Sequence, residues 1–302
     1  MPRDASPDPN VVEVDDELLR RWRLPLPDPG GGKKQRGRVL VVAGSRGIPG
    51  AAVLAASAAL RAGAGKVTIA TPACIAQPMA FAVPESLVIA MKETDAGGIA
   101  VHGLDALDEL AELEDRIQAV LIGPGLPYDD ATRGLTAALL EKFSEAAIVL
   151  DAGAMSVART GIRFAGSVLL TPHAGEMASL TGGTKDAVLA DAQAAALDAA
   201  RTWHSVVALK GAVTWIAAPD ARAWRHEGGN VGLGISGSGD VLSGLIAGLA
   251  ARGAPLEQAS VWGVALHARA GDKLAKRLGV LGYLAREIPA EVPALMAALG
   301  AR

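Results

Sequence analysis

Residues 234–249 read GISGSGDVLSGLIAGL and combine a glycine-rich turn, one carboxylate and an apolar stretch. The apolar residues after Asp240 recur at helical spacing, so the glycine segment predicts the N-terminus of a helix. Glycines let backbone N–H groups approach a ligand without side-chain clashes, and a helix N-terminus adds partial positive charge. We therefore predict that Gly237, Ser238 and Gly239 form an anion hole for a phosphate or a developing phosphoryl charge.

Asp240 stands beside this anion hole and is our candidate catalytic residue. A carboxylate at this place can accept the proton of a hydroxyl group that attacks phosphorus. The alternative is an ordinary helix cap, because Asp and Ser commonly cap helices, and the segment alone favours neither interpretation. The chain lacks G-x-x-x-x-G-K-[ST], which argues against a P-loop NTPase, and GSRGIPG does not fit G-x-G-x-x-G, which argues against a Rossmann dehydrogenase.

Three other polar or glycine-containing segments follow apolar runs. Lys210 in LKGAVT can pair with nucleotide phosphates as a point charge, although a surface lysine is the alternative. His173 in TPHAGE, beside Glu176, can donate to a ligand or serve only the turn. GPGLP joins the rigid Pro124 to the freely rotating Gly125, so that backbone can touch a ligand closely.

Short apolar runs alternate with helical stretches along the chain, and each run ends in a Gly, Pro or polar turn. This alternation predicts an α/β fold with a mainly parallel central sheet and helices on both faces. Ligands of such sheets bind beyond the carboxyl ends of the strands, where the motifs above lie. We interpret residues 39–44, 66–72, 119–125, 146–153, 167–176 and 205–217 as strands, and 51–65, 131–145 and 186–200 as helical.

Composition bounds the organisation of the 302 residues. We predict an N-terminal arm over residues 1–36, mobile at 1–12 and with a short helix at 14–22, followed by one domain over 37–302. The net charge of −3 gives no reason to expect nucleic acid as a partner. No apolar run reaches the roughly 18 residues of a membrane span, and the N-terminus has no secretory signal. With its single cysteine, the chain is expected in the cytoplasm.

The motifs GSRGIPGA, TPHAGE and GSGDVLSG together resemble the ADP-dependent NAD(P)H-hydrate dehydratase family of the ribokinase-like superfamily. The resemblance runs over about residues 15–298 and implies a three-layer sandwich. Bifunctional relatives of this family also carry an epimerase domain. The residues before Gly37 are too few to contain it, so we expect another protein to perform the epimer step.

The resemblance implies a repair reaction on NADH or NADPH that has been hydrated at C6 of the nicotinamide ring. The family phosphorylates this hydroxyl group with ADP as donor and releases AMP. Phosphate then leaves, and the reduced cofactor is regenerated. Mg²⁺ is expected for the phosphoryl transfer, but the sequence identifies no metal ligands. Family membership also implies a homo-oligomer, with a tetramer as one arrangement.

The resemblance assigns residues to two ligands. Ala51, Gly125, His173 and Asp240 match the positions that bind the hydrated dinucleotide, with Glu176 beside His173 as a supporting residue. The adenine-nucleotide segment corresponds to Lys210, Gly211, Ala212, Val213, Thr214 and Gly239, and Asn230 is expected to shape the same pocket as a supporting residue.

Two positions depart from the family pattern. LDAGAM stands where the family often has LDADAL, so Gly153 lacks a carboxylate and the role of that acid cannot be transferred. Asp151 remains, ranked below Asp240. GSGD stands where GTGD is common, and Ser238 keeps the hydroxyl group.

Two other functions compete with the dehydratase interpretation. A kinase of the same fold acting on a small alcohol, such as a sugar or vitamin precursor, would use the same anion hole and base. TPHAGE and GSRGIPGA argue against it. A non-catalytic adenine-nucleotide-binding module would be favoured if Asp240 proved dispensable. The choice of ADP over ATP rests on the resemblance alone.

Overall fold

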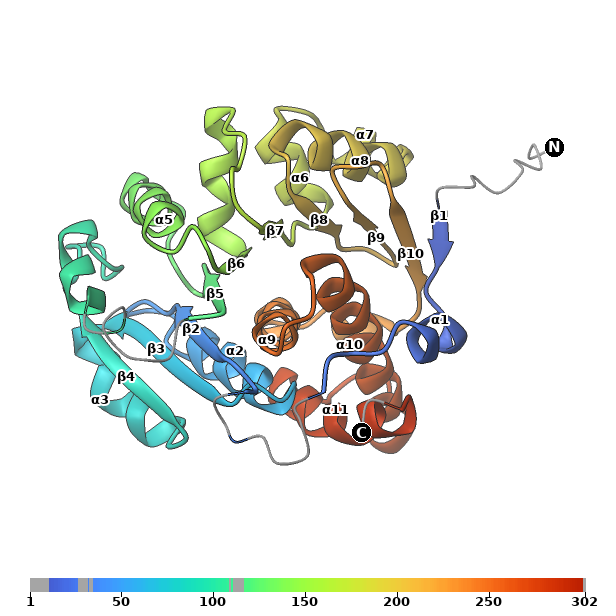
Figure 1. Ribbon diagram of the computed structural model, residues 1–302, viewed down its shortest axis with the longest axis horizontal. Helices are drawn as coiled ribbons and strands as arrows, with labels where there is room; N and C mark the ends of the chain where they lie inside the picture. The colour runs from blue at the N-terminus through green and yellow to red at the C-terminus, as the bar shows by residue number, and fades with distance from the viewer. Residues whose placement is uncertain (1–10, 27–31, 33–34, 109, 111–116, 301–302) are drawn as a thin grey trace.

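The computed structural model describes residues 11–26, 32, 35–108, 110 and 117–300. Its strands are β1 (Val11–Glu13), β2 (Arg38–Val42), β3 (Lys66–Pro72), β4 (Ser86–Met91), β5 (Ala119–Ile122), β6 (Ala147–Leu150), β7 (Val168–Leu170), β8 (Val206–Leu209), β9 (Val213–Ala217) and β10 (Ala223–Glu227). They form one sheet in the order β1-β10-β9-β8-β7-β6-β5-β2-β3-β4. Only β9 runs antiparallel to its neighbours, and helices cover both faces (Figure 1). The predicted α/β fold is confirmed.

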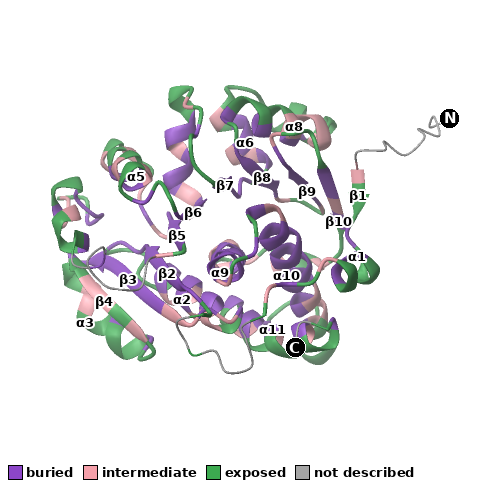
Figure 2. Ribbon diagram, in the orientation of Figure 1, coloured by how far each residue is buried: buried purple, intermediate pink, exposed green. Residues whose placement is uncertain are grey.

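Both faces of the sheet are buried, as Figure 2 shows for its central strands. In β2, Val39 and Val41 belong to one apolar cluster, whereas Leu40 and Val42 belong to the other. Successive side chains of a strand point to opposite faces, so a continuous apolar run is the pattern of a strand covered on both sides.

Two sets of helices form the outer layers. On one face lie α2 (Gly50–Arg61), α9 (Ser238–Ala251), α10 (Leu256–Leu278) and α11 (Ile288–Ala298). The other face carries α5 (Asp130–Lys142), η2 (Ala152–Thr160), α6 (Ala174–Thr181), α7 (Lys185–Ala190) and α8 (Ala192–Trp203). The remaining helical segments are α1 (Asp16–Arg21), α3 (Ala73–Ala82), η1 (Val101–Leu107), η3 (Val231–Leu233) and η4 (Ala285–Glu287). Within the described residues, no helix is both long and apolar enough to span a bilayer.

Helices α2 and α9 approach closely at two glycines of α9. A Cβ atom added to Gly244 would lie 2.3 Å from the carbonyl oxygen of Ala55, and one added to Gly248 would lie 2.5 Å from that of Ala59. No side chain fits at either glycine, which explains the small residues on both helices. The body of α9 is thereby held against α2.

The N-terminal residues are integrated into the fold. The helix expected at 14–22 is present as α1, capped by Asp15, whose Oδ1 accepts from Leu18 N at 2.8 Å. Residues 11 and 12 were expected to be mobile, and this is wrong, because Val11–Glu13 pairs with β10. Trp22 also stacks on Trp224 of β10 with 5.6 Å between ring centroids. Residues 1–10 lie outside the described residues, and the boundary at residue 37 stays a prediction.

Residues 205–217 form two strands instead of the predicted one. The chain reverses between β8 and β9, which pair antiparallel with Val207 opposite Ala217. The turn was missed because it occupies only residues 210–212 and apolar residues lie on both sides of it. The strands β4 and β10 were also missed.

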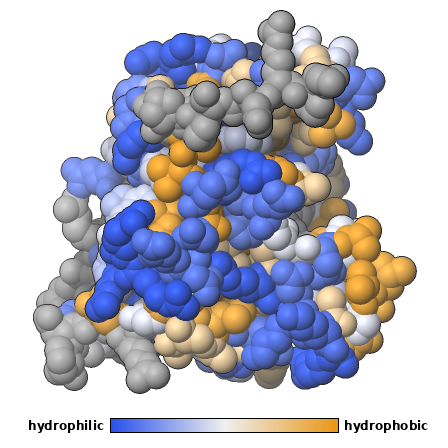
Figure 3. All heavy atoms as spheres, turned by 90° about the vertical axis from the view of Figure 1, so that its right-hand side faces the viewer, coloured by the Kyte–Doolittle hydropathy of each residue, from blue (hydrophilic) through white to orange (hydrophobic). Residues whose placement is uncertain are grey.

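Figure 3 shows the side of the molecule that lies at the right in Figure 1. This face is mostly hydrophilic, with scattered apolar areas.

Candidate functional site

Strand register brings three predicted segments together at the carboxyl edge of the sheet. Leu150 of β6 pairs with Leu170 of β7, so the next residues, Asp151 and Thr171, are neighbours. The Thr171 hydroxyl group donates to Asp151 Oδ1 at 2.8 Å. One strand further, Lys210 N donates to the Pro172 carbonyl at 2.8 Å. The end of β6, TPHAGE and LKGAVT therefore form one continuous rim.

Ala51 and Gly125 meet at the point where the strand order reverses. From β2 the chain continues to β3 and β4 on one side, then returns to β5, β6 and β7 on the other. Gly125 has φ +69°, and a Cβ there would lie 2.8 Å from the Cβ of Ala51 and 2.7 Å from the Ile48 carbonyl oxygen. Such a reversal opens a crevice in which α/β proteins bind ligands. Two of the four residues predicted to contact the dinucleotide thus lie side by side at this reversal.

The predicted helix start is present at the N-terminus of α9. Gly237 has φ +87°, and a Cβ there would lie 2.4 Å from Leu54 Cδ1, so glycine is required. The first intrahelical bond runs from Val241 N to the Gly237 carbonyl, which leaves the preceding amides without helical acceptors. A Cβ on Gly239 would lie 3.5 Å from Lys210 Nζ, so the lysine ammonium group reaches this helix end.

Ser238 contacts His267 at the start of α9. Its N–H donates to the Ile235 carbonyl at 3.2 Å, and its hydroxyl group lies 3.1 Å from His267 Nε2. His267 Nε2 also lies 3.1 Å from the Ser238 carbonyl oxygen, which can only accept, so this nitrogen carries the proton and the Ser238 hydroxyl group accepts from it. The backbone N–H of Ser238 is thus engaged within the protein, whereas its hydroxyl proton is not used by His267. The anion-hole roles of Gly237, Ser238 and Gly239 stay predictions.

Lys210 lies among three carboxylates. Its Nζ is 3.4 Å from Asp151 Oδ1 and 3.9 Å from Glu176 Oε2, and its side chain is 21% exposed. Burial lowers the pKa of Lys210, but Asp151, Glu176 and Asp240 together raise it above its usual value. The lysine is therefore a fixed positive charge beside the start of α9.

Asp240 has the properties of a general base. It is the third residue of α9 and is half-buried. Burial and the neighbouring Asp151 carboxylate raise the pKa of Asp240 to about 6, and Lys210 opposes this in part. A carboxylate whose pKa lies near neutrality is ionised at pH 7 yet accepts a proton more readily than an exposed aspartate.

His173 and Glu176 hold each other at the start of α6. His173 Nδ1 accepts from the amides of Gly175 and Glu176 at 3.0 and 3.1 Å, so a neutral ring carries its proton on Nε2. Glu176 accepts from His173 N at 2.8 Å and from the Tyr128 hydroxyl at 3.0 Å. Burial and Glu176 raise the pKa of Tyr128. Tyr128, which sequence reasoning missed, directly follows GPGLP, and this position was the available signal.

A cavity of about 770 Å³ lies between the LKGAVT turn and the start of α9. Asn230 organises one wall: its Nδ2 donates to Asp272 at 3.0 Å, and its Oδ1 accepts from Gly232 N and the Tyr283 hydroxyl at 3.0 Å. Of the predicted nucleotide residues only Val213 does not line this cavity and faces a neighbouring hollow. The predicted residues that do line it are His173, Lys210, Gly211, Ala212, Thr214, Asn230, Ser238 and Gly239.

Two histidines in this cavity escaped prediction. Burial lowers the pKa of both His226 and His267 to about 4, so both rings are neutral at pH 7. His226 lies on β10 and His267 on α10. Their neighbours come from distant parts of the chain, so no local pattern indicated them.

Gly153 allows the loop after β5 to approach η2. A Cβ at Gly153 would lie 2.5 Å from the Pro127 carbonyl oxygen and 2.9 Å from that of Leu126. The carboxylate common at this position in the family cannot be accommodated unless the loop moves. The glycine at position 153, which departs from the family pattern, is therefore explained by the lack of space for a side chain at this position.

Gly153→Ala is expected to destabilise the protein by about 1–3 kcal/mol, because backbone atoms must shift to accept the new methyl group. Thermal unfolding measures the change. Gly134→Ala is the matched control: this exposed helical glycine has 3.5 Å of clearance to its nearest contact, and alanine there should be neutral or stabilising. An unchanged melting temperature for Gly153→Ala would contradict the steric argument.

The fold and site define a class of protein: an α/β sandwich in which the glycine-rich start of a helix, a charged lysine and a half-buried aspartate lie together. The solved ribokinase-like protein of Enterococcus faecalis superimposes with a TM-score of 0.84 at 23% identity, covering 99% of this chain and all of that one. This likeness confirms the ribokinase-like fold.

The chain belongs to the NAD(P)H-hydrate dehydratase family, whose model matches residues 39–294. It is 51% identical over 95% of its length, and 97% of the relative's, to the ADP-dependent (S)-NAD(P)H-hydrate dehydratase of Xanthomonas campestris pv. campestris. The Bacillus subtilis ADP/ATP-dependent NAD(P)H-hydrate dehydratase, co-crystallised with ATP and Mg²⁺, matches with a TM-score of 0.83 at 29% identity, covering 97% and 100% of the two chains. The bifunctional NAD(P)H-hydrate repair enzyme of Moorella thermoacetica is 40% identical over 92% of this chain, which spans 54% of that enzyme.

Proposed function

We propose that this protein converts the S-epimer of hydrated NADH or NADPH back to NAD(P)H, using ADP and releasing AMP and phosphate. The observation that carries the proposal is the position of Asp240, half-buried with a pKa of about 6 next to Lys210 and the start of α9. Family membership and 51% identity to an ADP-dependent dehydratase support it.

In this proposal Asp240 removes the proton of the C6 hydroxyl group while the oxygen attacks the β-phosphorus of ADP. AMP departs, and Lys210 with the Gly239 amide stabilises the charge on the transferring phosphoryl group. The ring nitrogen then expels phosphate from C6, and loss of a proton from the adjacent carbon restores the double bond. A poor leaving group, hydroxide, has become a good one.

The two substrates have separate places in this proposal. The cavity of about 770 Å³ beside LKGAVT accepts the adenine nucleotide. The hydrated ring approaches Asp240 from the crevice of Ala51 and Gly125, with His173 between the two sites. The volume lies within the ordinary range for small-molecule pockets.

The residues around Lys210 are compatible with Mg²⁺. Among the described residues no group of three or more His, Cys, Asp or Glu side chains can hold a metal. Mg²⁺ commonly keeps several waters and binds only one or two carboxylates together with substrate phosphates. We therefore expect a donor set of one or two carboxylates, waters and substrate phosphates. Glu176 and Asp151 are the carboxylates that would hold the ion, which when bound neutralises phosphate charge.

The proposal is tested by incubating the protein with hydrated NADH and either ADP or ATP. We expect the dihydronicotinamide absorbance to return with ADP, with equimolar AMP and phosphate formed. No return with either nucleotide would overturn the dehydratase, and ATP-dependent phosphorylation of a small alcohol would favour the kinase instead. Chelation of Mg²⁺ should abolish turnover.

The oligomeric state and the location in the cell remain predictions. We propose a homo-oligomer in the cytoplasm, from family resemblance and from the composition of the chain. Light scattering of the purified protein measures the first of these directly.

A further inference from the structure

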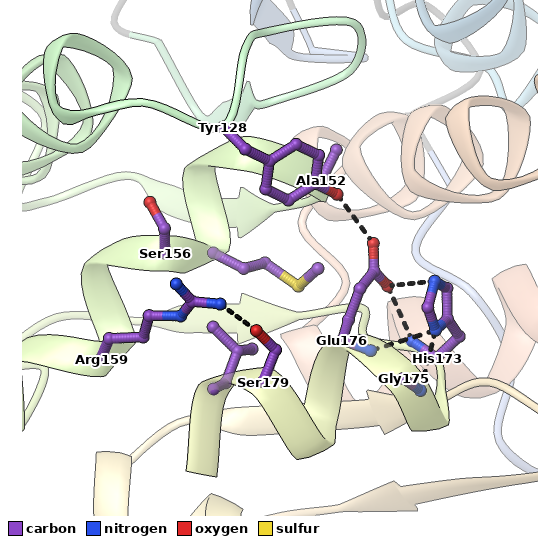
Figure 4. Close-up of a pocket in the computed structure, with 10 residues that line it drawn as sticks. Tyr128, Ala152, Ser156, Arg159, His173, Gly175, Glu176 and Ser179 are labelled. Atoms are coloured by element: carbon purple, nitrogen blue, oxygen red, sulfur yellow. Dashed lines mark hydrogen bonds and ion pairs between the residues drawn. The ribbon is translucent and has the colours of Figure 1, made fainter. Parts of the chain in front are cut away.

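A second, smaller pocket of about 190 Å³ opens beside the proposed reaction centre (Figure 4). It lies between η2 and α6, and His173 lines both this pocket and the large cavity. Glu176, which faces Lys210, also lines it. Its volume is below that of pockets that enclose a whole small-molecule ligand, so it suits one part of a larger ligand.

Arg159 is the cation of this pocket. Its guanidinium group extends from η2 towards α6, where it donates to the Ser179 hydroxyl group (Figure 4). In the described part of the chain Arg159 forms no ion pair with a carboxylate. A guanidinium group has five donors in a planar fork that matches phosphate oxygens. Most of its donors are therefore free for an anionic ligand.

The carboxylate that lines the pocket does not neutralise Arg159. Glu176 Oε1 accepts from Tyr128, and Oε2 accepts from His173 N and faces Lys210. Its charge is thus directed to other groups. The loop that carries Tyr128 closes over the pocket because Gly153 lets it approach η2.

We infer that Arg159 and Ser179 bind a phosphate group of the hydrated dinucleotide. This inference rests on the proposed function and adds a phosphate site to it. Two phosphate sources have the same chemistry: the diphosphate bridge, present in both substrates, and the 2′-phosphate, present only in hydrated NADPH.

The test is Arg159→Gln, with Arg163→Gln as the matched control. Arg163 is exposed and lines neither pocket. We expect the KM of Arg159→Gln for the hydrated dinucleotide to rise about tenfold or more, because a charge-assisted hydrogen bond is lost. Its kcat and its KM for ADP should stay unchanged. A rise for hydrated NADPH alone assigns the 2′-phosphate, and equal rises for both substrates assign the diphosphate bridge. Unchanged KM values for both would overturn the inference.

Equilibrium binding separates this inference from the proposed function. Calorimetry of NADPH and NADH needs no turnover, so it applies even if the dehydratase assay fails. We expect Arg159→Gln to weaken binding of one or both nucleotides about tenfold relative to the wild type and to Arg163→Gln. Equal affinity in all three proteins would remove Arg159 as a phosphate ligand.

Discussion

Asp240→Asn is expected to abolish ADP-dependent turnover of hydrated NADH and to stabilise the folded protein at pH 7. Turnover is lost because asparagine cannot accept the proton of the C6 hydroxyl group. The stability gain follows from the raised pKa of Asp240, which is about 6 in the folded protein against an ordinary value of 3.8. A carboxyl group with this shift favours the folded state below pH 4 and loses that contribution as pH rises through 6.

At pH 7 the ionised Asp240 therefore costs about 1–3 kcal/mol of unfolding free energy, which the neutral asparagine avoids. Chemical unfolding of both proteins from pH 4 to pH 8 measures the difference, which should be largest above pH 6 and shrink towards pH 4. AMP binding should survive and serves as the control for folding. Full turnover by the variant would remove Asp240 as the base. A variant less stable than the wild type at pH 7 would contradict the claim that ionised Asp240 destabilises the folded protein.

The same pKa sets the pH dependence of the wild-type enzyme. If Asp240 is the base, kcat/KM should rise with pH through about 6 and then reach a plateau, because only the ionised form accepts a proton.

Lys210→Gln is expected to have the second large effect, because it removes the positive charge from among Asp151, Glu176 and Asp240. Transition-state charge on the phosphoryl group loses one stabilising partner, so kcat should fall about 100-fold. Asp240 loses the neighbour that lowers its pKa, so the acid limb of the pH profile should move above pH 6. The folded state should lose about 3 kcal/mol, because carboxylates remain partly buried without compensation.

Steady-state kinetics over pH and chemical unfolding measure these three changes. Lys185→Gln, at an exposed lysine of α7, is the control and should leave all of them unchanged. An acid limb that stays at its wild-type position in Lys210→Gln would show that the lysine does not control Asp240. A specific fall in kcat without a pH shift would limit Lys210 to phosphate binding.

Local sequence signals predicted the elements that local forces decide. The helix start at Gly237 could be predicted because a glycine turn precedes an apolar helical period, and the helix at 14–22 could be predicted from the acidic residues in its first turn. The turn between β8 and β9 was missed, because antiparallel pairing depends on which strand lies next in space. Arg159 gave no signal either, since its importance comes from a pocket formed by separate segments. Tyr128 was indicated only by its position directly after GPGLP.

The sequence by itself determined the alternation of strands and helices, the family, and the set of segments that follow the strand ends. Only the tertiary structure decided that Lys210 lies between Asp151 and Glu176, that Ser238 contacts His267, and that Gly153 lets the loop after β5 approach η2. The reason is that charge interactions and desolvation depend on distance and burial, and residues far apart in the chain acquire both only when the sheet assembles.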